Sequence, residues 1–340
     1  MSTPVALPEW PAPETLGLRG SYRDAPEAFR VEEVSGWQIS GEGEHLLCEV
    51  EKTGLNSADL AERLAALCSA RPADVGYCGN KDRHAVTRQW FSVRTPIGFA
   101  WPDEAPREEF DARGAGWRLL TTARHGRKLR RGDHGANRFR LVLRLAAEAE
   151  GGLPSADVVR AVLERGVPNY FGPQRFGRGY ANLTRARRWA EEGARLPPRG
   201  NQRGFTISAA RSLLFNEVVA ARVRARTIER CMDGDVAEAN LPTGPLWGRG
   251  RSATDGAAAE IERAALEPWA LWCRALEHAG LSQERRPLVL KPKALEVEVA
   301  DDRLILAFTL APGAFATALL PALGAFVDAA AQAPTEGAAA

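Results

Sequence analysis

The sequence predicts an α/β protein in which one discontinuous domain, built on a mixed α+β sheet, carries a second α/β domain as an insertion. The chain has 340 residues, about twice the usual length of a single domain. Strand-like segments lie toward both ends of the chain, and arginine-bearing helical segments lie between them. We therefore expect residues 1–165 and 289–328 to form the discontinuous domain, residues 166–288 the insertion, and residues 329–340 a tail without regular structure.

Short apolar segments in the first third of the chain are typical of strands. Residues 29–34 and 45–51 predict two strands, and residues 74–78 and 89–93 predict two more. The last two are joined by residues 79–84, which are mostly charged or polar. We expect this segment to be a loop between strands.

A helix is predicted to follow the second strand. Ser57 is a suitable N-cap residue, and Leu60, Leu64 and Leu67 recur at helical spacing. These leucines should face a core.

The middle of the chain changes character near residue 166. Residues 139–145 predict a strand, and Ser155 opens a helix that Gly166 ends. Residues 167–177 are rich in Gly, Pro and aromatic side chains, which is typical of an ordered loop at a domain junction.

The proposed insertion contains two arginine-bearing helices, near residues 182–192 and 208–230. Residues 234–256 hold enough Gly and Pro to predict an irregular loop.

Strands return near the end of the chain. Residues 295–299 and 304–309 predict two strands, followed by an apolar helix from Ala314. This segment is too short to fold alone, so we expect it to complete the sheet begun by the N-terminal half.

Composition excludes several protein classes. Hydrophobic residues make up 45% and charged residues 26% of the chain, close to the average for globular proteins. We find no apolar run long enough to span a membrane and no secretory signal, so we expect a cytoplasmic protein. The five cysteines form no C-x-x-C pair and the five histidines form no zinc motif, so we expect reduced, mostly buried thiols and no metal.

Positive charge is concentrated in two zones. Residues 124–140 carry six Arg and one Lys against one Asp, and residues 171–230 carry thirteen Arg against four Glu. Guanidinium groups bind phosphate through a two-pronged fork and stack on bases. The two zones therefore predict a polyanionic partner, and Arg124, Arg127, Lys128, Arg130 and Arg131 are candidates to follow its backbone.

Asp82 is the candidate reactive group. It lies between Lys81 and Arg83, whose charges favour an ionised carboxylate, so it can serve as a nucleophile or a base. By charge alone, the segment is also typical of a solvated turn with surface ion pairs.

Longer motifs separate these two interpretations. Residues 79–90 read Gly-Asn-Lys-Asp-Arg-His-Ala-Val-Thr-Arg-Gln-Trp, which resembles the signature G-x-K-D-[RK]-H-A-V-T-x-Q-W of the tRNA pseudouridine synthase D (TruD) family. Residues 166–177 are similar to a second family motif. Shorter similarities, in the family's order, occur at residues 124–130, 135–139, 208–216 and 312–317.

The resemblance implies a pseudouridine synthase catalytic fold with an inserted TRUD-type domain. It also implies isomerisation of uridine to pseudouridine at position 13 of tRNA, without cofactor or metal, by an enzyme that we expect to be a monomer. Asp82 falls on the family's catalytic aspartate, and Phe29, Asn137 and Phe315 match residues that contact the substrate. Phe139 falls where most other pseudouridine synthase families place a tyrosine, although core packing explains it equally well.

The implied reaction leaves two routes open. The carboxylate can attack the sugar, or it can remove the C2′ proton to give a glycal. In both routes the uridine must be flipped out of its stem, which stacking on aromatic side chains offsets.

Two other functions are consistent with the fold and the basic surface. One is a non-catalytic RNA-binding or RNA-folding protein, which loss of the aspartate would indicate, whereas Asp82 is present in an intact motif. The other is the same chemistry on a different RNA, because shape readout leaves no simple code in the sequence.

Overall fold

The computed structural model describes residues 6–11, 14–146, 153–198 and 200–332. Contacts between Cα atoms divide the chain into two units. The sheet unit comprises the described residues within 17–160, 292–314 and 324–332, and the helical unit comprises those within 6–16, 161–291 and 315–323. The division lies close to the expected limits of the insertion, but it groups the described residues within 6–16 and residues 315–323 with the helical unit.

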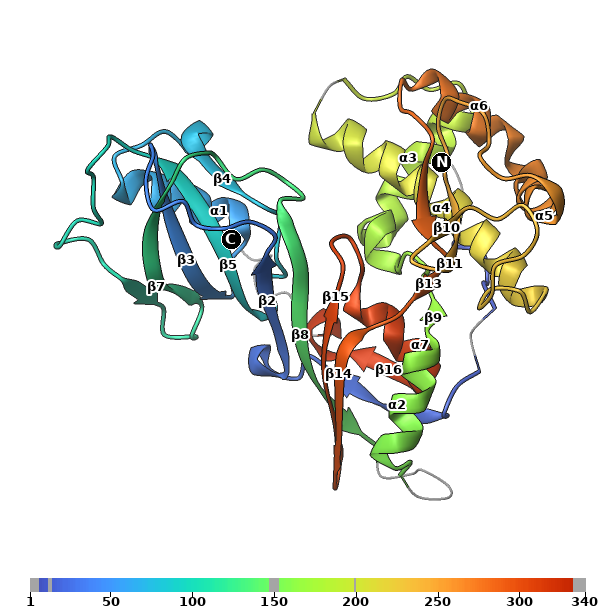
Figure 1. The fold of residues 1–340 in the computed structure, drawn as a ribbon, viewed down its shortest axis with the longest axis horizontal. Coiled ribbons are helices and arrows are strands. Elements are labelled where there is room, and N and C mark those ends of the chain that lie inside the picture. The colour runs from blue at the N-terminus through green and yellow to red at the C-terminus, as the bar shows by residue number, and fades with distance from the viewer. Residues whose placement is uncertain (1–5, 12–13, 147–152, 199, 333–340) are drawn as a thin grey trace, which may run out of the picture. The chain divides into compact units, whose positions relative to one another are not determined.

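One mixed sheet of eleven strands, counted over the described residues, forms the sheet unit (Figure 1). The main path runs β14-β15-β8-β2-β5-β3-β7-β6, and β1, β16 and β4 pair beside it. The strands are β1 (Leu18–Tyr22), β2 (Phe29–Ser35), β3 (His45–Thr53), β4 (Val75–Tyr77), β5 (Val86–Arg94), β6 (Glu108–Phe110), β7 (Gly116–His125), β8 (His134–Leu145), β14 (Lys293–Ala300), β15 (Arg303–Leu310) and β16 (Gly324–Asp328).

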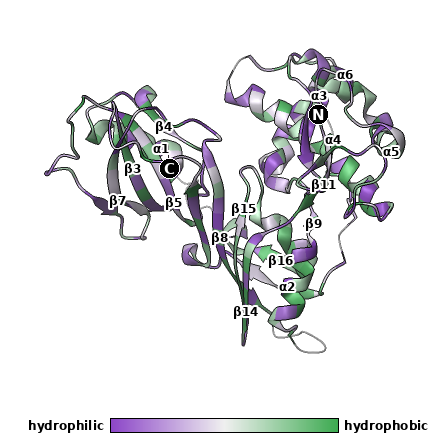
Figure 2. Cartoon of the chain, in the orientation of Figure 1, coloured by the Kyte–Doolittle hydropathy of each residue, from purple (hydrophilic) through white to green (hydrophobic). Residues whose placement is uncertain are grey.

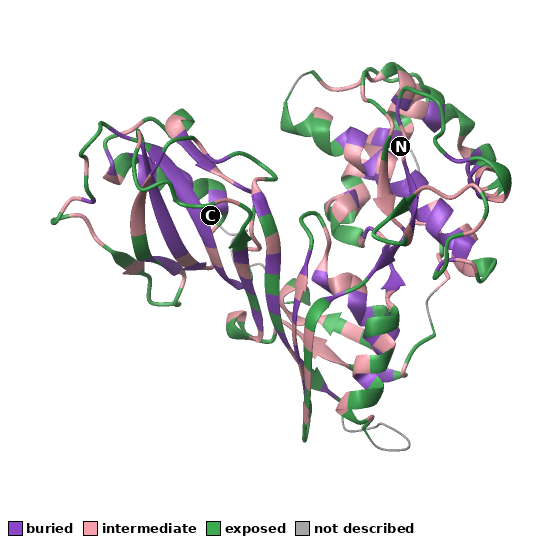
Figure 3. Ribbon diagram, in the orientation of Figure 1, coloured by how far each residue is buried: buried purple, intermediate pink, exposed green. Residues whose placement is uncertain are grey.

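Each strand predicted from the sequence lies within or overlaps one of these strands. The two C-terminal strands β14 and β15 join the sheet at β8, as expected, through antiparallel pairing of β15 with β8. β8 alternates buried and exposed residues along most of its length (Figure 3). Hydrophilic and hydrophobic residues are interspersed along the same strand (Figure 2). Parallel pairing occurs between β2 and β5 and between β1 and β16.

Helix α1 (Ser57–Leu67) covers one face of β3 and β5. Leu60 and Leu64 are buried there, whereas Leu67 is only partly buried. The expected N-cap is wrong by one residue, because Asn56 is the N-cap and Ser57 is the first helical residue. The Ser57 side chain does not cap the helix and bonds the loop before β5 instead.

The expected apolar helix from Ala314 is wrong, because most of this segment leads into the last strand of the sheet. The chain forms only a 3-10 turn (Ala316–Leu319) and the short helix α7 (Leu320–Leu323) before β16 begins. Gly324 allows this change of direction with a φ of +154°, and a Cβ there would lie 1.8 Å from Leu18 O. Close pairing with β1 thus overrides the helical preference of this alanine-rich segment. Helix α8 (Ala329–Gln332) occupies the start of the expected tail, whose remainder at 333–340 lies outside the described residues.

Helices α3 (Ala181–Glu191), α4 (Asn201–Arg224), α5 (Gly256–Leu266) and α6 (Ala270–His278) surround the core of the helical unit. α4 is the long central helix, and it begins and ends earlier than the predicted 208–230 segment. Two small sheets complete the unit. They consist of β10 (Ala237–Glu238), β11 (Leu241–Leu246) and β12 (Glu284–Pro287), and of β9 (Val167–Pro168) paired with β13 (Val289–Leu290).

The expected irregular loop at residues 234–256 is therefore wrong in part. It contains β10 and β11, and β11 is the middle strand of its sheet. Pro242 and Pro245 lie within β11, where they remove only their own N–H groups from the pairing. Helix α2 (Ala156–Arg165), by contrast, begins after Ser155 and ends before Gly166 at a φ of +96°, as predicted.

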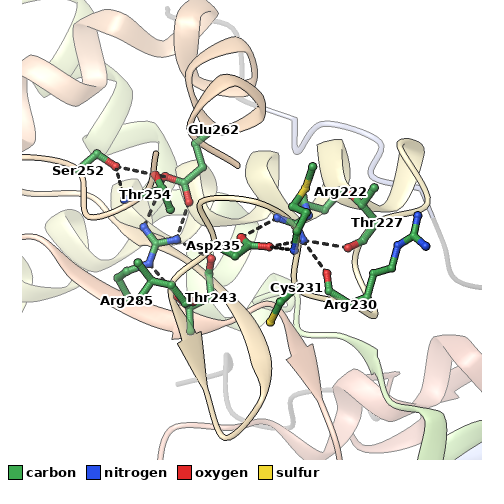
Figure 4. Close-up of polar contacts among 12 residues, drawn as sticks. Arg222, Thr227, Arg230, Cys231, Asp235, Thr243, Ser252, Thr254, Glu262 and Arg285 are labelled. Atoms are coloured by element: carbon green, nitrogen blue, oxygen red, sulfur yellow. Dashed lines mark hydrogen bonds and ion pairs between the residues drawn. The ribbon is translucent and has the colours of Figure 1, made fainter. Parts of the chain in front are cut away.

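Two buried ion pairs stabilise the helical unit (Figure 4). Arg222 of α4 binds Asp235 through two contacts of 2.8 and 2.9 Å, and the side chains are 3% and 1% exposed. Arg285 of β12 binds Glu262 of α5, whose carboxylate also accepts the Thr254 hydroxyl (3.0 Å).

The five cysteines are free thiols. Four are buried and Cys231 is exposed, which confirms the expectation of mostly buried, unpaired thiols. No helix within the described ranges combines the length and the apolar character that a membrane span requires.

Candidate active site

The segment from Gly79 to Trp90 forms the loop between β4 and β5 and the first half of β5. Two buried polar side chains fix the start of this loop. The Ser57 hydroxyl donates to Gln89 Oε1 (2.7 Å) and accepts the Lys81 N–H (3.0 Å). The Gln89 amide in turn donates to Gly79 O (3.2 Å). The backbone before Asp82 is thereby tied to both α1 and β5.

Asp82 presents a carboxylate with both oxygens engaged. Its Oδ1 accepts the backbone N–H of His84 at 2.9 Å, and its Oδ2 lies 2.6 Å from Arg23 Nη2. The Asp82 side chain remains 25% exposed. It is held in position and is still accessible to a ligand.

Arg23 connects this carboxylate to three other side chains. Its Nη1 binds Asp328 Oδ2 at 3.1 Å, and its Cζ lies 4.6 Å from the centre of the Phe29 ring and 5.4 Å from that of Tyr22. Its backbone adopts the left-handed region with a φ of +60°. Burial and the Asp328 carboxylate raise the pKa of Tyr22 to about 12, so the phenol stays protonated and donates to Asp328 (3.2 Å).

Lys52 lies next to the loop that carries Asp82. Its Nζ donates to Leu55 O (2.8 Å) and to the backbone oxygen of Asp82 (3.2 Å), and the residue is 0% exposed. Burial lowers the pKa of Lys52 to about 8, and the Asp82 carboxylate partly opposes that shift. A buried cation thus holds the backbone of Asp82.

The two cations that flank Asp82 in the sequence bind other groups. Lys81 Nζ pairs with Glu33 Oε2 at 2.7 Å, and both side chains are almost fully buried. Arg83 is exposed and donates from Nε to Gly54 O (2.8 Å). The counter-charge at Asp82 therefore comes from the arginine after β1 and not from its sequence neighbours.

Asn137 lies on β8, buried beside His134. Its Nδ2 is 3.2 Å from His134 Nε2, and its Oδ1 finds no hydrogen-bond partner among the described residues. Burial and the charge of Lys81 lower the pKa of His134. A neutral His134 can accept the Asn137 N–H, which leaves the amide oxygen available.

Phe139 follows on the same strand and packs in an aromatic group with Phe29 and Phe308. It stacks on Phe308 with centroids 5.5 Å apart and meets Phe29 edge-on at 6.4 Å. The structure thus connects Phe139, Phe29, Arg23 and Asp82 in a continuous series of contacts.

Phe315 belongs to the helical unit. Its ring meets Phe171 edge-on at 6.3 Å and lies 5.4 Å from Arg175 Cζ. Both neighbours come from the Gly- and Pro-rich segment at residues 167–177.

The first basic zone contains side chains of two kinds. Arg124 binds its own unit, donating to Gly43 O (2.6 and 3.1 Å) and to Thr95 Oγ1 (2.8 Å). Arg127 is half exposed and pairs with Asp133 at 2.6 Å. Arg124 is thus a structural residue, and Arg127 is the better candidate to bind a phosphate.

This site offers a positioned, accessible carboxylate beside a guanidinium and an aromatic ring. Over residues 10–186, the chain matches the family described as tRNA pseudouridine synthase D (TruD). The chain belongs to this TruD family. Within the described ranges, no group of three His, Cys, Asp or Glu side chains is placed to hold a metal ion.

Individual proteins named tRNA pseudouridine synthase D resemble the chain over almost its whole length. The protein of Cellvibrio japonicus is 44% identical over 308 residues, which cover 90% of this chain and 89% of that one. The protein of Chromohalobacter salexigens is 40% identical over 345 residues, covering 94% and 97%.

A solved structure supports the fold. The crystal structure of a putative TruD from Methanosarcina mazei superposes with a TM-score of 0.63 at 20% identity, covering 93% of this chain and 96% of that one. The predicted α/β class with a pseudouridine synthase fold is thereby confirmed.

Sequence reasoning missed Arg23, Lys52 and Asp328. Lys52 had a visible signal, because it lies on the same face of β3 as the apolar residues Cys48 and Val50, four and two positions before it. Arg23 and Asp328 had none, since they meet through pairing of strands from opposite ends of the chain.

Proposed function

We propose that this TruD-family protein isomerises uridine to pseudouridine at position 13 of tRNA, with Asp82 as the reacting carboxylate. The supporting observation is the Asp82 carboxylate, held by Arg23 at 2.6 Å within the family signature and left 25% exposed. Phe29, Asn137 and Phe315 are proposed to contact the uridine, on the family resemblance.

The reaction breaks the N1–C1′ bond and forms a C5–C1′ bond. In one route an Asp82 oxygen bonds to C1′ as N1 leaves with the bonding electrons, and C5 later displaces the carboxylate. In the other, Asp82 takes the C2′ proton as N1 leaves, and returns it when C5 joins C1′. Both routes end with loss of the C5 proton to solvent and gain of a proton at N1, so that the product is an isomer of uridine.

Arg23 has the same role in both routes. Its guanidinium fixes the orientation of the carboxylate and balances its charge while the Phe29 ring lies against it. A preorganised charge of this kind costs no reorganisation at the moment of reaction. We infer that Arg23 acts on Asp82 and does not itself exchange a proton with the substrate.

Tritium release from [5-³H]uridine-labelled tRNA tests the function. The protein should release tritium from a transcript with uridine at position 13 and release none from a matched transcript with cytidine there. Equal release from both would place the reaction at another uridine. No release from either, with tight binding, would assign the protein to the non-catalytic RNA-binding class.

Two aspartate variants test whether Asp82 is the reacting carboxylate. Asp82→Asn should abolish release and preserve tRNA binding, because it removes the reactive carboxylate and almost no volume. Asp24→Asn is the matched control, since Asp24 is exposed and pairs with Arg144. Full activity of Asp82→Asn would disprove the assignment.

A further inference from the structure

Two guanidinium groups of the helical unit meet the same buried aromatic ring. Arg175 Cζ lies 5.0 Å and Arg286 Cζ lies 4.4 Å from the centre of the Phe171 ring. Phe171 is 4% exposed and meets Phe315 edge-on. The positive charges of the two side chains are thus concentrated around one ring.

Arg286 is fixed by an anchored amide. Its Nη2 donates to Asn169 Oδ1 at 2.7 Å. Asn169 is held in turn, because its Nδ2 donates to Pro287 O (2.8 Å) and its backbone N–H donates to Leu288 O (2.8 Å). This guanidinium is therefore preorganised.

Arg175 has different surroundings from Arg286. It is in the 3-10 turn Pro173–Phe176 and contacts the rings of Phe171 and Phe315. Its Nε is buried without a hydrogen-bond partner, and no acidic side chain among the described residues pairs with it. Burial lowers the pKa of Arg175, and burial together with the charge of Arg175 lowers the pKa of Arg286 to about 10.

Two other arginines of this unit, buried Arg222 and partly buried Arg285, have acidic partners, unlike Arg175. Arg222 has Asp235 and Arg285 has Glu262, each at hydrogen-bond distance (Figure 4). Removing a cation from water without a compensating anion is unfavourable, and a contact with an aromatic face offsets only part of that loss. Ring contacts alone therefore do not explain Arg175.

We propose that Arg175, together with Arg286, forms a binding site for a phosphate group, and specifically for a phosphodiester of the RNA substrate. Guanidinium groups bind phosphate through their planar fork. The phosphate site itself does not depend on the proposed function, and only the assignment of the phosphate to RNA rests on it. Since Phe315 is proposed to contact the uridine and lies 5.4 Å from Arg175 Cζ, the phosphate belongs to that nucleotide or to a neighbour in sequence.

The salt dependence of tRNA binding tests this site, measured by fluorescence anisotropy over a series of KCl concentrations. Arg175→Met keeps the length and the apolar stem, and should weaken binding and reduce the log–log salt slope by about one. Arg175→Lys keeps the charge, and should weaken binding with a slope near that of the wild type. Arg274→Met, an equal loss of charge at an exposed position of α6, should keep the wild-type slope.

A slope for folded Arg175→Met that equals the wild-type slope would overturn the proposal, and so would equal losses in Arg175→Met and Arg274→Met. If Arg175→Met does not fold, phenylglyoxal labelling of the wild type replaces it. Bound tRNA should then protect Arg175 and not Arg274, and no protection of Arg175 would overturn the site.

Inorganic phosphate distinguishes the source of the anion. Phosphate could raise the melting temperature of the wild type in a saturable way and have no such effect on Arg175→Met. If the salt slope of tRNA binding were also the same in both proteins, the site would bind free phosphate and the RNA proposal would be overturned. Tritium release is a separate readout. If the wild type releases no tritium but its salt slope depends on Arg175, the phosphate site stands and the proposed function is wrong. If the wild type releases tritium but its slope does not depend on Arg175, the proposed function stands and the phosphate site is wrong.

Discussion

Arg23 lies 2.6 Å from Asp82, and the same guanidinium binds Asp328 and covers the ring of Phe29. One side chain thus sets the position of the carboxylate, an aromatic neighbour and the end of the last strand of the sheet. The loop that carries Asp82 therefore does not position this side chain alone.

We expect Arg23→Met to lower the single-turnover rate of pseudouridine formation about 10²-fold or more, because it removes a preorganised charge from the reacting group. Binding of tRNA should change far less. Arg23→Lys should retain part of the rate. Arg19→Met, at an exposed position of β1, is the matched control. A wild-type rate for Arg23→Met would refute this role.

Lys52 predicts a pH dependence of stability. Its pKa is lowered to about 8 by burial, whereas an unfolded lysine titrates at about 10.4. Between these values the unfolded chain binds more protons than the folded chain, so the free energy of unfolding contributed by this group rises with pH. The slope reaches at most about 1.4 kcal/mol per pH unit.

Urea unfolding at several pH values measures this effect. The stability of the wild type relative to Lys52→Met should increase between pH 8 and about pH 10. Lys293→Met, which removes an exposed lysine, should run parallel to the wild type. Parallel curves for Lys52→Met as well would show that the pKa of Lys52 is not lowered.

Substitutions in the first basic zone, residues 124–140, should affect either tRNA binding or protein stability, depending on the residue. Reversing the charges of Arg127 and Lys128 should weaken tRNA binding and flatten its salt dependence. Arg124→Met should instead lower the free energy of unfolding by about 1–3 kcal/mol, because it leaves Gly43 O and Thr95 without their donor. The salt slope and thermal unfolding of each variant decide between these roles, and an unchanged slope after charge reversal excludes Arg127 and Lys128 from the interface.

The buried pair Arg222–Asp235 should contribute strongly to the helical unit. Arg222→Met leaves an unpaired buried carboxylate and should cost about 3–5 kcal/mol of unfolding free energy. Combining it with Asp235→Leu should recover part of that loss. Arg263→Met, exposed on α5, should change stability little, and a similar loss there would point to a general effect of charge.

Sequence patterns predicted most local structure and the position of Asp82, because both depend on residues that are close in the chain. The alternation in β8 and the leucines of α1 are examples. Long-range pairing explains the errors. β16 is a strand in an alanine-rich segment because Gly324 lets it pair with β1, and β11 tolerates two prolines because its other backbone groups pair with β10 and β12.

In the candidate site, too, the sequence pattern predicted the local motif and missed the contacts made by residues distant in the chain. The motif pointed to Asp82, but its counter-ion Arg23 follows β1 and its support Lys52 lies on β3, both outside the motif. Lys81 and Arg83, the cations expected to act on Asp82, bind Glu33 and Gly54 instead. Charges adjacent in sequence are therefore poor guides to the charges that meet in the fold.

Pairing of β16 with β1 also has a consequence for how the protein is made. Asp328, which holds Arg23, is synthesised 305 residues after it. Until β16 emerges from the ribosome, β1 lacks that neighbour and Arg23 lacks its second anchor. A nascent chain, or a product of premature termination before residue 324, therefore carries residues 79–90 but lacks the Asp328 contact that helps to hold Arg23 beside Asp82.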